Sequence, residues 1–235
     1  KDMPDFYAKI KGSKVENGEL KLELDYENVV QYKNNTEQEK LEVTYGTVEN
    51  EVAINNSLSS ILAQMKKNPT GTFELTRDYD AATITGDNSS LLGADLEFKG
   101  TLNGNGHTIY NLSKPIFDKL RGATITDLII ENAHLTNSLY ARSRGAIANE
   151  TYSGCTISNV HIKNITIVTS YMNSGYGSIV GALRSSTIKE CSATSVTMNA
   201  SNNSQIKSLG GIVGTASDSI ITDCYATGTL NADTY

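Results

Sequence analysis

The chain has 235 residues, of which 38% are hydrophobic and 20% are charged, and its formal net charge is −6. This composition is typical of a mildly acidic folded protein, and it argues against disorder and against a nucleic-acid partner. No apolar run approaches the ~20 residues that span a bilayer, and the N-terminus lacks a signal-peptide pattern.

The first predicted unit is a small antiparallel β module over residues 1–50. Polar and apolar residues alternate in "ELKLELDY" from Glu19 and in "KLEVTYG" from Lys40. Turn-forming residues separate such runs at 16–18 and 33–35. Alternation with period two indicates strands, and the turns between them favour hairpins.

A short amphipathic helix is predicted near residues 57–67. Leu58, Ile61, Leu62 and Met65 follow helical spacing, Ser57 is a suitable N-cap, and Pro69 follows the end. Because a solenoid needs its open apolar end covered, we expect this helix to cap a second unit over residues 51–235.

That second unit contains an internal repeat. The segments "ATITDLIIENA", "CTISNVHIKNI", "STIKECSATSV" and "SIITDCYATGT" begin at residues 123, 155, 186 and 219, at offsets of 32, 31 and 33. The segments "KPIFD", "GAIAN", "GSIVG" and "GGIVG" keep the same interval. The chain stops inside an echo of the repeat and starts without Met, so we expect a piece of a longer protein, truncated at its C-terminus.

The columns of the repeat indicate strands that meet at a bend. Positions are counted from the first residue of each of the four longer segments, and equivalent positions form a column. The third, sixth and eighth positions are apolar, and the seventh is mostly polar. Turn-forming residues such as Thr126-Asp127 and Ser158-Asn159 break the alternation between the third and sixth positions. Stacked coils would align equivalent side chains in interior ladders. The predicted fold is therefore mostly β, a right-handed parallel β-helix with coils of about 32 residues, in which "GTFELTRDYDAATI" from Gly71 and "GTLNGNGHTIYNL" from Gly100 form the first coils.

Few residues suggest chemistry. His107, His134 and His161 lack HExxH or helical spacing, so no zinc hydrolase centre is expected in this segment. His107 could serve as a base, but packing in a turn is favoured. Asp78, Asp80 and Asp87 could hold calcium, but solvated turn carboxylates are favoured. We predict no catalytic residue, metal ligand or cofactor here.

The three cysteines have a structural explanation. Cys191 and Cys224 fall in the apolar sixth column with Leu128 and Val160, which predicts that they fill the interior. A disulfide between them is compatible with neighbouring coils, and the sequence leaves it open. Cys155 opens its repeat and has no predicted partner.

A binding surface is predicted on the loops that leave successive coils. Tyrosine and arginine, which are enriched in interfaces, gather there, with Tyr152 and Met172 nearby. Packing on their own coil is the competing explanation. The predicted contact residues are Tyr140, Arg142, Arg144, Tyr171 and Tyr176.

The stretch "GTLNGNGHTIYNLSKPIFDKLRGATITDLIIENAHLTN" resembles a segment of the Gram-positive immunoglobulin A1-specific zinc metallopeptidase family. The units "GSIVG" and "GGIVG" resemble the GLUG-type repeats of such surface proteins. This likeness covers about residues 57–235, and the N-terminal module resembles the small β modules that precede the region only weakly. In the family, the zinc ligands lie in a distant HExxH segment that nothing here matches, so the resemblance implies a segment that is inert as a protease by itself.

The resemblance implies a non-catalytic β-helix region that positions a host glycoprotein, such as immunoglobulin A1, for a zinc metalloendopeptidase. The parent's catalytic domain would carry the zinc and would be a partner in the same chain, and the protein would be secreted or attached to the cell wall. An alternative is an adhesin or structural stalk without peptidase activity. A third hypothesis is a carbohydrate-active β-helix enzyme. Such enzymes carry stacked acidic residues on one strand face, and the outward seventh column of this sequence has none.

Overall fold

The computed structural model describes residues 9–16, 19–25, 43–47, 57–84, 89–94, 96–136, 143–169, 175–200 and 208–232. The chain divides into two compact units, Lys1–Asn56 and Ser57–Tyr235. The boundary predicted between residues 50 and 51 lies outside the described residues. No helix in the described ranges is long and apolar enough to cross a bilayer.

The first unit contains a three-stranded antiparallel sheet. Its strands β1 (Lys9–Glu16), β2 (Glu19–Asp25) and β3 (Val43–Thr47) have the order β1-β2-β3. Glu16 pairs with Glu19, and Glu19 pairs with Thr47. The predicted antiparallel module is therefore confirmed.

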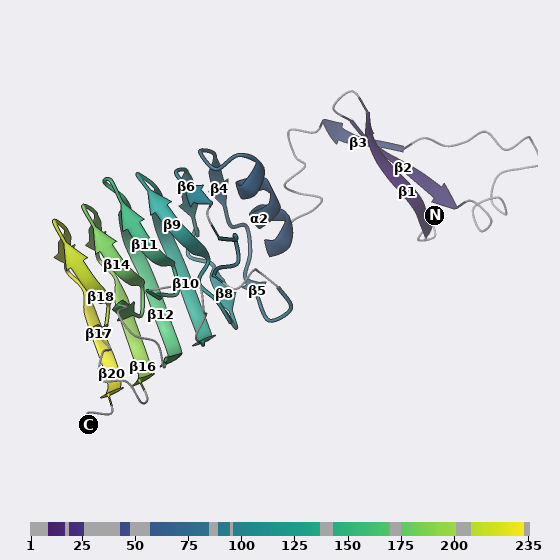
Figure 1. Cartoon of the computed structure of the whole chain (residues 1–235). Coiled ribbons are helices and arrows are strands. Elements are labelled where there is room, and N and C mark those ends of the chain that lie inside the picture. The colour runs from purple at the N-terminus through teal and green to yellow at the C-terminus, as the bar shows by residue number, and fades with distance from the viewer. Residues whose placement is uncertain are drawn as a thin grey trace, which may run out of the picture. The chain divides into compact units, whose positions relative to one another are not determined.

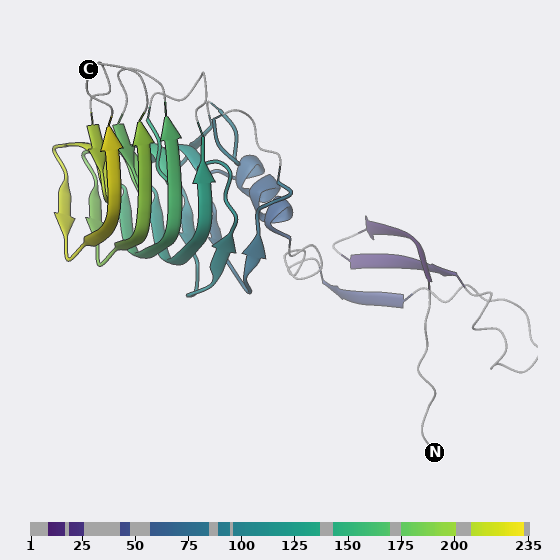
Figure 2. The same ribbon diagram turned by 90° about the horizontal axis from the view of Figure 1, so that it is seen from below.

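The second unit is a parallel β-solenoid, in which strands from successive coils lie side by side along one axis (Figures 1 and 2). The first and second faces share the long strands β10 (Thr124–Leu135) and β12 (Thr156–Thr169). The first face adds β4 (Thr72–Glu74), β7 (Thr101–Asn103), β15 (Thr187–Lys189) and β19 (Ile220–Thr222). The second face adds β5 (Tyr79–Asp80), β8 (Thr108–Tyr110), β16 (Ser192–Ala200) and β20 (Tyr225–Ala232).

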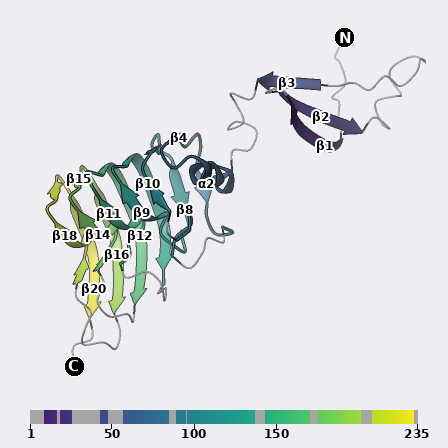
Figure 3. The ribbon, with the colours of Figure 1, turned by 45° about the horizontal axis from the view of Figure 1, so that its top comes forward.

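The third face closes the coil. It contains β6 (Glu97–Phe98), β9 (Phe117–Arg121), β11 (Ala148–Tyr152), β14 (Val180–Arg184) and β18 (Val213–Ser217). The short strands β13 (Gly175–Gly177) and β17 (Ser208–Gly210) form a parallel pair beside it. The faces wrap around the solenoid core, as the tilted view shows (Figure 3).

The predicted ladders are confirmed by the register. Ile125 pairs with Ile157, Ile157 with Ile188, and Ile188 with Ile221, all in parallel strands. The first three side chains are 0% exposed, whereas Ile221 in the last described coil is 44% exposed. Each rung is therefore buried by a coil on either side of it.

The bend between the first two faces depends on a left-handed backbone. Asp127, Asn159, Glu190 and Asp223 have φ of 53°, 52°, 55° and 53°. Asp and Asn tolerate this conformation better than most residues. The Asn159 amide also donates to the Asp127 carboxylate over 2.6 Å, which links the bends of adjacent coils. This turn explains why the alternation fails between the third and sixth columns.

Helix α2 (Leu58–Lys67) lies at one end of the solenoid, beside β4 and β6 (Figure 1). The Ser57 side chain accepts a hydrogen bond from the Ser60 N–H over 3.2 Å, which satisfies one free donor of the first turn. Leu58, Ile61, Leu62 and Met65 are buried and belong to the same apolar core as the coils. The predicted capping helix is confirmed.

Glycines in the second repeated segment allow adjacent coils to approach closely. A Cβ on Gly145 would lie 2.4 Å from the Ile179 carbonyl oxygen and 2.5 Å from the Val180 backbone. A Cβ on Gly181 would lie 2.2 Å from the Arg144 nitrogen. Both distances are far below van der Waals contact, so the spacing of "GAIAN" and "GSIVG" reflects packing between coils.

Candidate interaction surfaces

The loops that carry the predicted contact residues leave and re-enter the solenoid at equivalent places. Leu135, Ile167 and Met198 are in register just before residues 137–142, 170–174 and 201–207. After these segments, Arg144 bridges to Tyr176, and Tyr176 pairs with Leu209. The described residues on both sides of residues 137–142, 170–174 and 201–207 are therefore in register from coil to coil, and we call these three segments the flank.

Two of the five predicted contact residues are not on the surface. Arg144 is 2% exposed and Tyr176 is 1% exposed, and their backbones form a parallel bridge between neighbouring coils. Buried side chains cannot contact a partner unless the protein rearranges, so their place in an exposed contact face is corrected to packing. Tyr140, Arg142 and Tyr171 lie outside the described residues, and their role stays a prediction.

Arg144 belongs to a buried polar region near the third face. Its burial lowers the pKa of the guanidinium, while the charge of Asp118 opposes that shift. The Asn149 amide donates to the Asp118 carboxylate over 2.8 Å and to the Ser89 carbonyl over 3.2 Å. The attraction between a buried arginine and a nearby carboxylate offsets part of the cost of its desolvation, so this region is best explained as internal packing of the coils.

A second surface was missed by the sequence prediction, although Tyr152 was noted beside the predicted loop cluster. The Tyr152 ring lies between two guanidinium groups, with Arg121 Cζ and Arg184 Cζ each 5.2 Å from its centroid. Arg121, Tyr152 and Arg184 come from the neighbouring strands β9, β11 and β14. Cations over an aromatic face are attracted by its quadrupole. We call Glu97, Arg121, Glu150, Tyr152 and Arg184 the guanidinium ladder.

Carboxylates hold both guanidinium groups of the ladder. Arg121 donates from Nε and Nη2 to the two oxygens of Glu97, each over 2.9 Å, and from Nη1 to Ser153 Oγ over 3.2 Å. Arg184 donates from Nη1 to Glu150 Oε2 over 3.0 Å, and the Tyr152 hydroxyl donates to the same oxygen. The ladder therefore joins the strands β6, β9, β11 and β14 by side-chain contacts.

The ladder also shifts the titration of its members. The hydrogen bonds from Arg121 lower the pKa of Glu97, and the same pair raises the pKa of Arg121. Burial raises the pKa of Tyr152, and its hydrogen bond to Glu150 adds to the shift. Glu97 therefore stays ionised below the pH at which an ordinary glutamate is half protonated.

The lowered pKa of Glu97 predicts a pH dependence of stability. A carboxyl whose pKa is lower in the folded than in the unfolded state stabilises fully above its ordinary value of 4.5, and this contribution is lost as the pH falls through the lowered pKa. We expect Glu97→Gln to reduce the difference between urea midpoints at pH 6 and pH 3. Glu74→Gln, at an exposed residue of strand β4, is the control. If the difference between the urea midpoints at pH 6 and pH 3 is the same for both variants, the assignment to Glu97 is contradicted.

A hydrogen-bonded chain on the second face superficially resembles a hydrolase triad. His161 contacts Ser192 Oγ through Nδ1 at 2.8 Å and Asn159 Oδ1 through Nε2 at 2.9 Å. Asp127 is the carboxylate in this series of hydrogen bonds, and it contacts Asn159 rather than the imidazole of His161. Ser192 is 6% exposed and lies in register with His161. The chain is therefore a polar ladder between coils, and His161 has the surface role that the seventh column predicts.

Two of the three aspartates considered for calcium, Asp78 and Asp80, link neighbouring coils by hydrogen bonds. Asp78 accepts from the Thr108 N–H over 2.8 Å and lies 3.4 Å from His107 Nδ1. Asp80 accepts from the Asn111 amide and the Ala82 N–H, each over 2.9 Å, and these bonds lower its pKa. Asp87 lies outside the described residues. Among those that are described, no three His, Cys, Asp or Glu side chains gather as a metal site.

The cysteines are free thiols. Cys191 and Cys224 occupy the sixth column on adjacent coils. The Cys191 thiol donates to the Lys189 carbonyl and the Cys224 thiol to the Thr222 carbonyl, each over 3.1 Å. Burial raises the pKa of Cys191 to about 12. Cys155 is 1% exposed, and its N–H donates to Ser186 Oγ over 3.2 Å. Cys155 and Cys191 belong to the apolar core, and Cys224 packs against it.

The fold and these surfaces define a parallel β-solenoid with a helix over one end, and its described part presents polar ladders between neighbouring coils. The chain belongs to the M26 IgA1-specific metallo-endopeptidase N-terminal region family, whose model matches residues 6–164. Residues 207–231 match the GLUG motif, which contains the "GGIVG" unit. The predicted family is confirmed, and the match extends through the N-terminal module, further than the likeness in the sequence indicated.

Curated relatives agree with this family. The chain is 28% identical over 190 residues to an immunoglobulin A1 protease of Streptococcus pneumoniae, covering 76% of this chain and 9% of that protein. An immunoglobulin A1 protease of Streptococcus sanguinis is 26% identical over 218 residues, covering 78% of this chain and 12% of that protein. The zinc metalloprotease ZmpC of S. pneumoniae is 32% identical over 168 residues, covering 67% of this chain and 8% of that protein.

A solved IgA1 protease structure has the same fold. It superposes with a TM-score of 0.63 at 22% identity, covering 96% of this chain and 18% of that chain. At this identity the likeness supports the fold alone. The chain spans about a tenth of the length of the curated relatives it matches, so it corresponds to only a small part of those proteins.

Proposed function

We propose that this chain is the non-catalytic, substrate-positioning β-solenoid region of a zinc metalloendopeptidase that cleaves a host glycoprotein such as immunoglobulin A1. The observation that carries the proposal is the family match over residues 6–164, together with relatives named immunoglobulin A1 protease. In this proposal the zinc and the catalytic residues belong to another domain of the parent protein. The parent is secreted or attached to the cell wall.

The solenoid suits a positioning role because its coils are joined both inside and outside. Interior ladders fix the coil spacing, and polar ladders such as Asp127–Asn159 link the outer surface. A rigid body that binds a substrate away from the scissile bond can use that binding energy to orient the reacting groups. The flank is the proposed contact surface.

The direct test is binding of the isolated chain to immunoglobulin A1, with immunoglobulin G as the comparison, by biolayer interferometry. Saturable binding to immunoglobulin A1 supports the positioning role. Absence of binding at micromolar concentrations contradicts it. The alternative, an adhesin or structural stalk, is compatible with the GLUG match. It predicts that the full-length parent does not cleave an immunoglobulin to which it binds.

The proposed contact residues make a specific prediction. We expect the triple variant Tyr140→Ala, Arg142→Ala, Tyr171→Ala to weaken capture of immunoglobulin A1 at least about tenfold, because tyrosine and arginine are the residue types that dominate interface energetics. Its melting temperature should stay unchanged.

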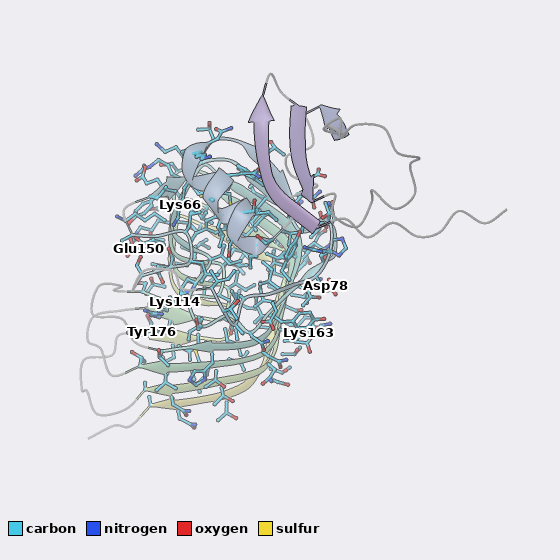
Figure 4. The ribbon with its side chains drawn as sticks, turned by 90° about the vertical axis from the view of Figure 1, so that its right-hand side faces the viewer. Lys66, Asp78, Lys114, Glu150, Lys163 and Tyr176 are labelled. Carbon is cyan, nitrogen blue, oxygen red and sulfur yellow. The ribbon has the colours of Figure 1, made fainter. Side chains whose placement is uncertain are left out.

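The matched control changes Tyr110, Lys163 and Tyr225 to alanine. These are again two tyrosines and one cation, and they are at least partly exposed on the second face. Lys163 lies on the opposite side of the solenoid from Tyr176, which is next to the flank (Figure 4). If the two triple variants bind immunoglobulin A1 with equal affinity, the proposal that the flank is the contact surface is wrong.

A further inference from the structure

The guanidinium ladder presents cationic groups that its internal contacts do not saturate. The side chains of Arg121 and Arg184 are 41% and 42% exposed. Among the described residues, the Arg184 side chain donates a hydrogen bond only from Nη1, whereas a guanidinium has five N–H donors. Its Nε and Nη2 hydrogens therefore have no protein acceptor in the described part of the chain.

The two arginines are held at a fixed separation. They lie on either side of Tyr152, on the strands before and after β11, so they are two coil spacings apart, or about 10 Å. Glu97 and Glu150 orient them from within the surface. A ligand that meets oriented guanidinium groups loses less conformational entropy on binding than one that must order them.

The charge of this surface differs from that of the whole chain. Lys99, whose ammonium lies 3.5 Å from Glu97, extends the ladder. The cations Lys99, Arg121 and Arg184 then exceed the carboxylates Glu97 and Glu150 by one charge, on a chain whose net charge is −6. The excess cation and the unsaturated N–H groups are complementary to an anionic partner.

The geometry of the ladder also limits which chemical class of ligand can bind. Both faces of the Tyr152 ring are covered by guanidinium groups, so the ring does not offer a stacking platform for a sugar or an aromatic side chain. The exposed edges of the guanidinium groups match carboxylates, which accept two parallel N–H bonds from an arginine. The partner is therefore best described by carboxylates with a separation near that of the two arginines.

We propose that the guanidinium ladder is a docking site for an acidic polypeptide segment with two carboxylates about 10 Å apart. One carboxylate binds the open Nε–Nη2 edge of Arg184, and the other binds the remaining N–H groups of Arg121. The site lies on the third face, on the side where Glu150 is seen, opposite Lys163 (Figure 4). It goes beyond the proposed function and does not depend on immunoglobulin recognition.

The test uses rigid peptides with defined carboxylate spacing. In a polyproline helix, residues i and i+3 share one side and lie ~9.3 Å apart. The probe is a capped peptide Pro-Pro-Glu-Pro-Pro-Glu-Pro-Pro, titrated into the full chain by NMR or calorimetry at low salt. We expect saturable binding that weakens at least tenfold with glutamine in place of both glutamates, and several-fold with the glutamates adjacent in sequence.

Variants of the protein locate the site. Arg184→Gln should weaken binding of the probe at least tenfold, Arg184→Lys should weaken it less, and Lys163→Gln on the second face should leave it unchanged. A melting temperature for each variant separates loss of binding from loss of fold. The proposal is overturned by absence of binding at millimolar probe, by binding that ignores Arg184, or by tighter, Arg184-dependent binding of a sulfated polysaccharide.

Discussion

Ile157→Asp is expected to unfold the solenoid. Ile157 is 0% exposed and lies between Ile125 and Ile188, so no solvent reaches a carboxyl placed there. Removal of the aliphatic side chain and burial of an unpaired polar group together cost about 5 kcal/mol or more, which is comparable to the whole stability of many domains. Far-ultraviolet circular dichroism and size-exclusion chromatography of the purified variant measure the effect.

The adjacent residue is the matched control for Ile157. Thr156 is in the same strand, points outward, and pairs with Thr124 and Thr187 on the first face. We expect Thr156→Asp to lower stability by less than about 1 kcal/mol, because its carboxylate remains hydrated. A folded Ile157→Asp protein as stable as the Thr156→Asp protein would show that the interior ladder is wrongly assigned.

Gly145→Ala is expected to give the second largest loss of stability, although only one methyl group is added. The new Cβ would meet the backbone of Ile179 and Val180 at 2.4 to 2.5 Å, and backbone in a paired strand cannot move aside independently. The adjacent coils would separate, which strains the hydrogen bonds from Ala146 to Ser178 and from Ile147 to Ile179. We expect a loss of about 3 kcal/mol, measured by urea denaturation.

Gly154→Ala separates this steric effect from the general effect of replacing glycine. A Cβ on Gly154 meets nothing within 4 Å, but its φ of +80° is unfavourable for alanine. The expected loss is therefore only about 1 kcal/mol. If Gly145→Ala and Gly154→Ala lower stability equally, close approach of the coils does not explain the glycines of the repeat.

The two proposed surfaces differ in how their residues are held. The described residues before and after the flank form ladders between coils, and Arg144 and Tyr176, which follow two of its segments, are buried. The guanidinium ladder lies directly on paired strands and is held by its own ion pairs. Sites on paired strands are positioned rigidly, so we expect the bound geometry of small acidic probes at the guanidinium ladder to be well defined.

The solenoid could be predicted from the sequence alone. A period near 32 residues requires stacked coils of equal length, and apolar columns at fixed positions require those side chains to face a shared interior, as Ile125, Ile157 and Ile188 do. The bend was readable as well, because Asp and Asn are residues that accept the left-handed backbone found at Asp127 and Asn159. The helix followed from its cap and its apolar spacing.

Which polar and aromatic side chains contact one another, and which are buried, could be read only from the folded structure. Arg121, Tyr152 and Arg184 belong to successive coils but are of different residue types, so they do not form a repeated column in the sequence. Their contact depends on the register of the strands on the third face. Arg144 and Tyr176 have the composition of an interface, yet neighbouring coils bury them. Periodicity reports what all coils share, whereas contacts between unlike side chains depend on how far each coil is shifted against the next.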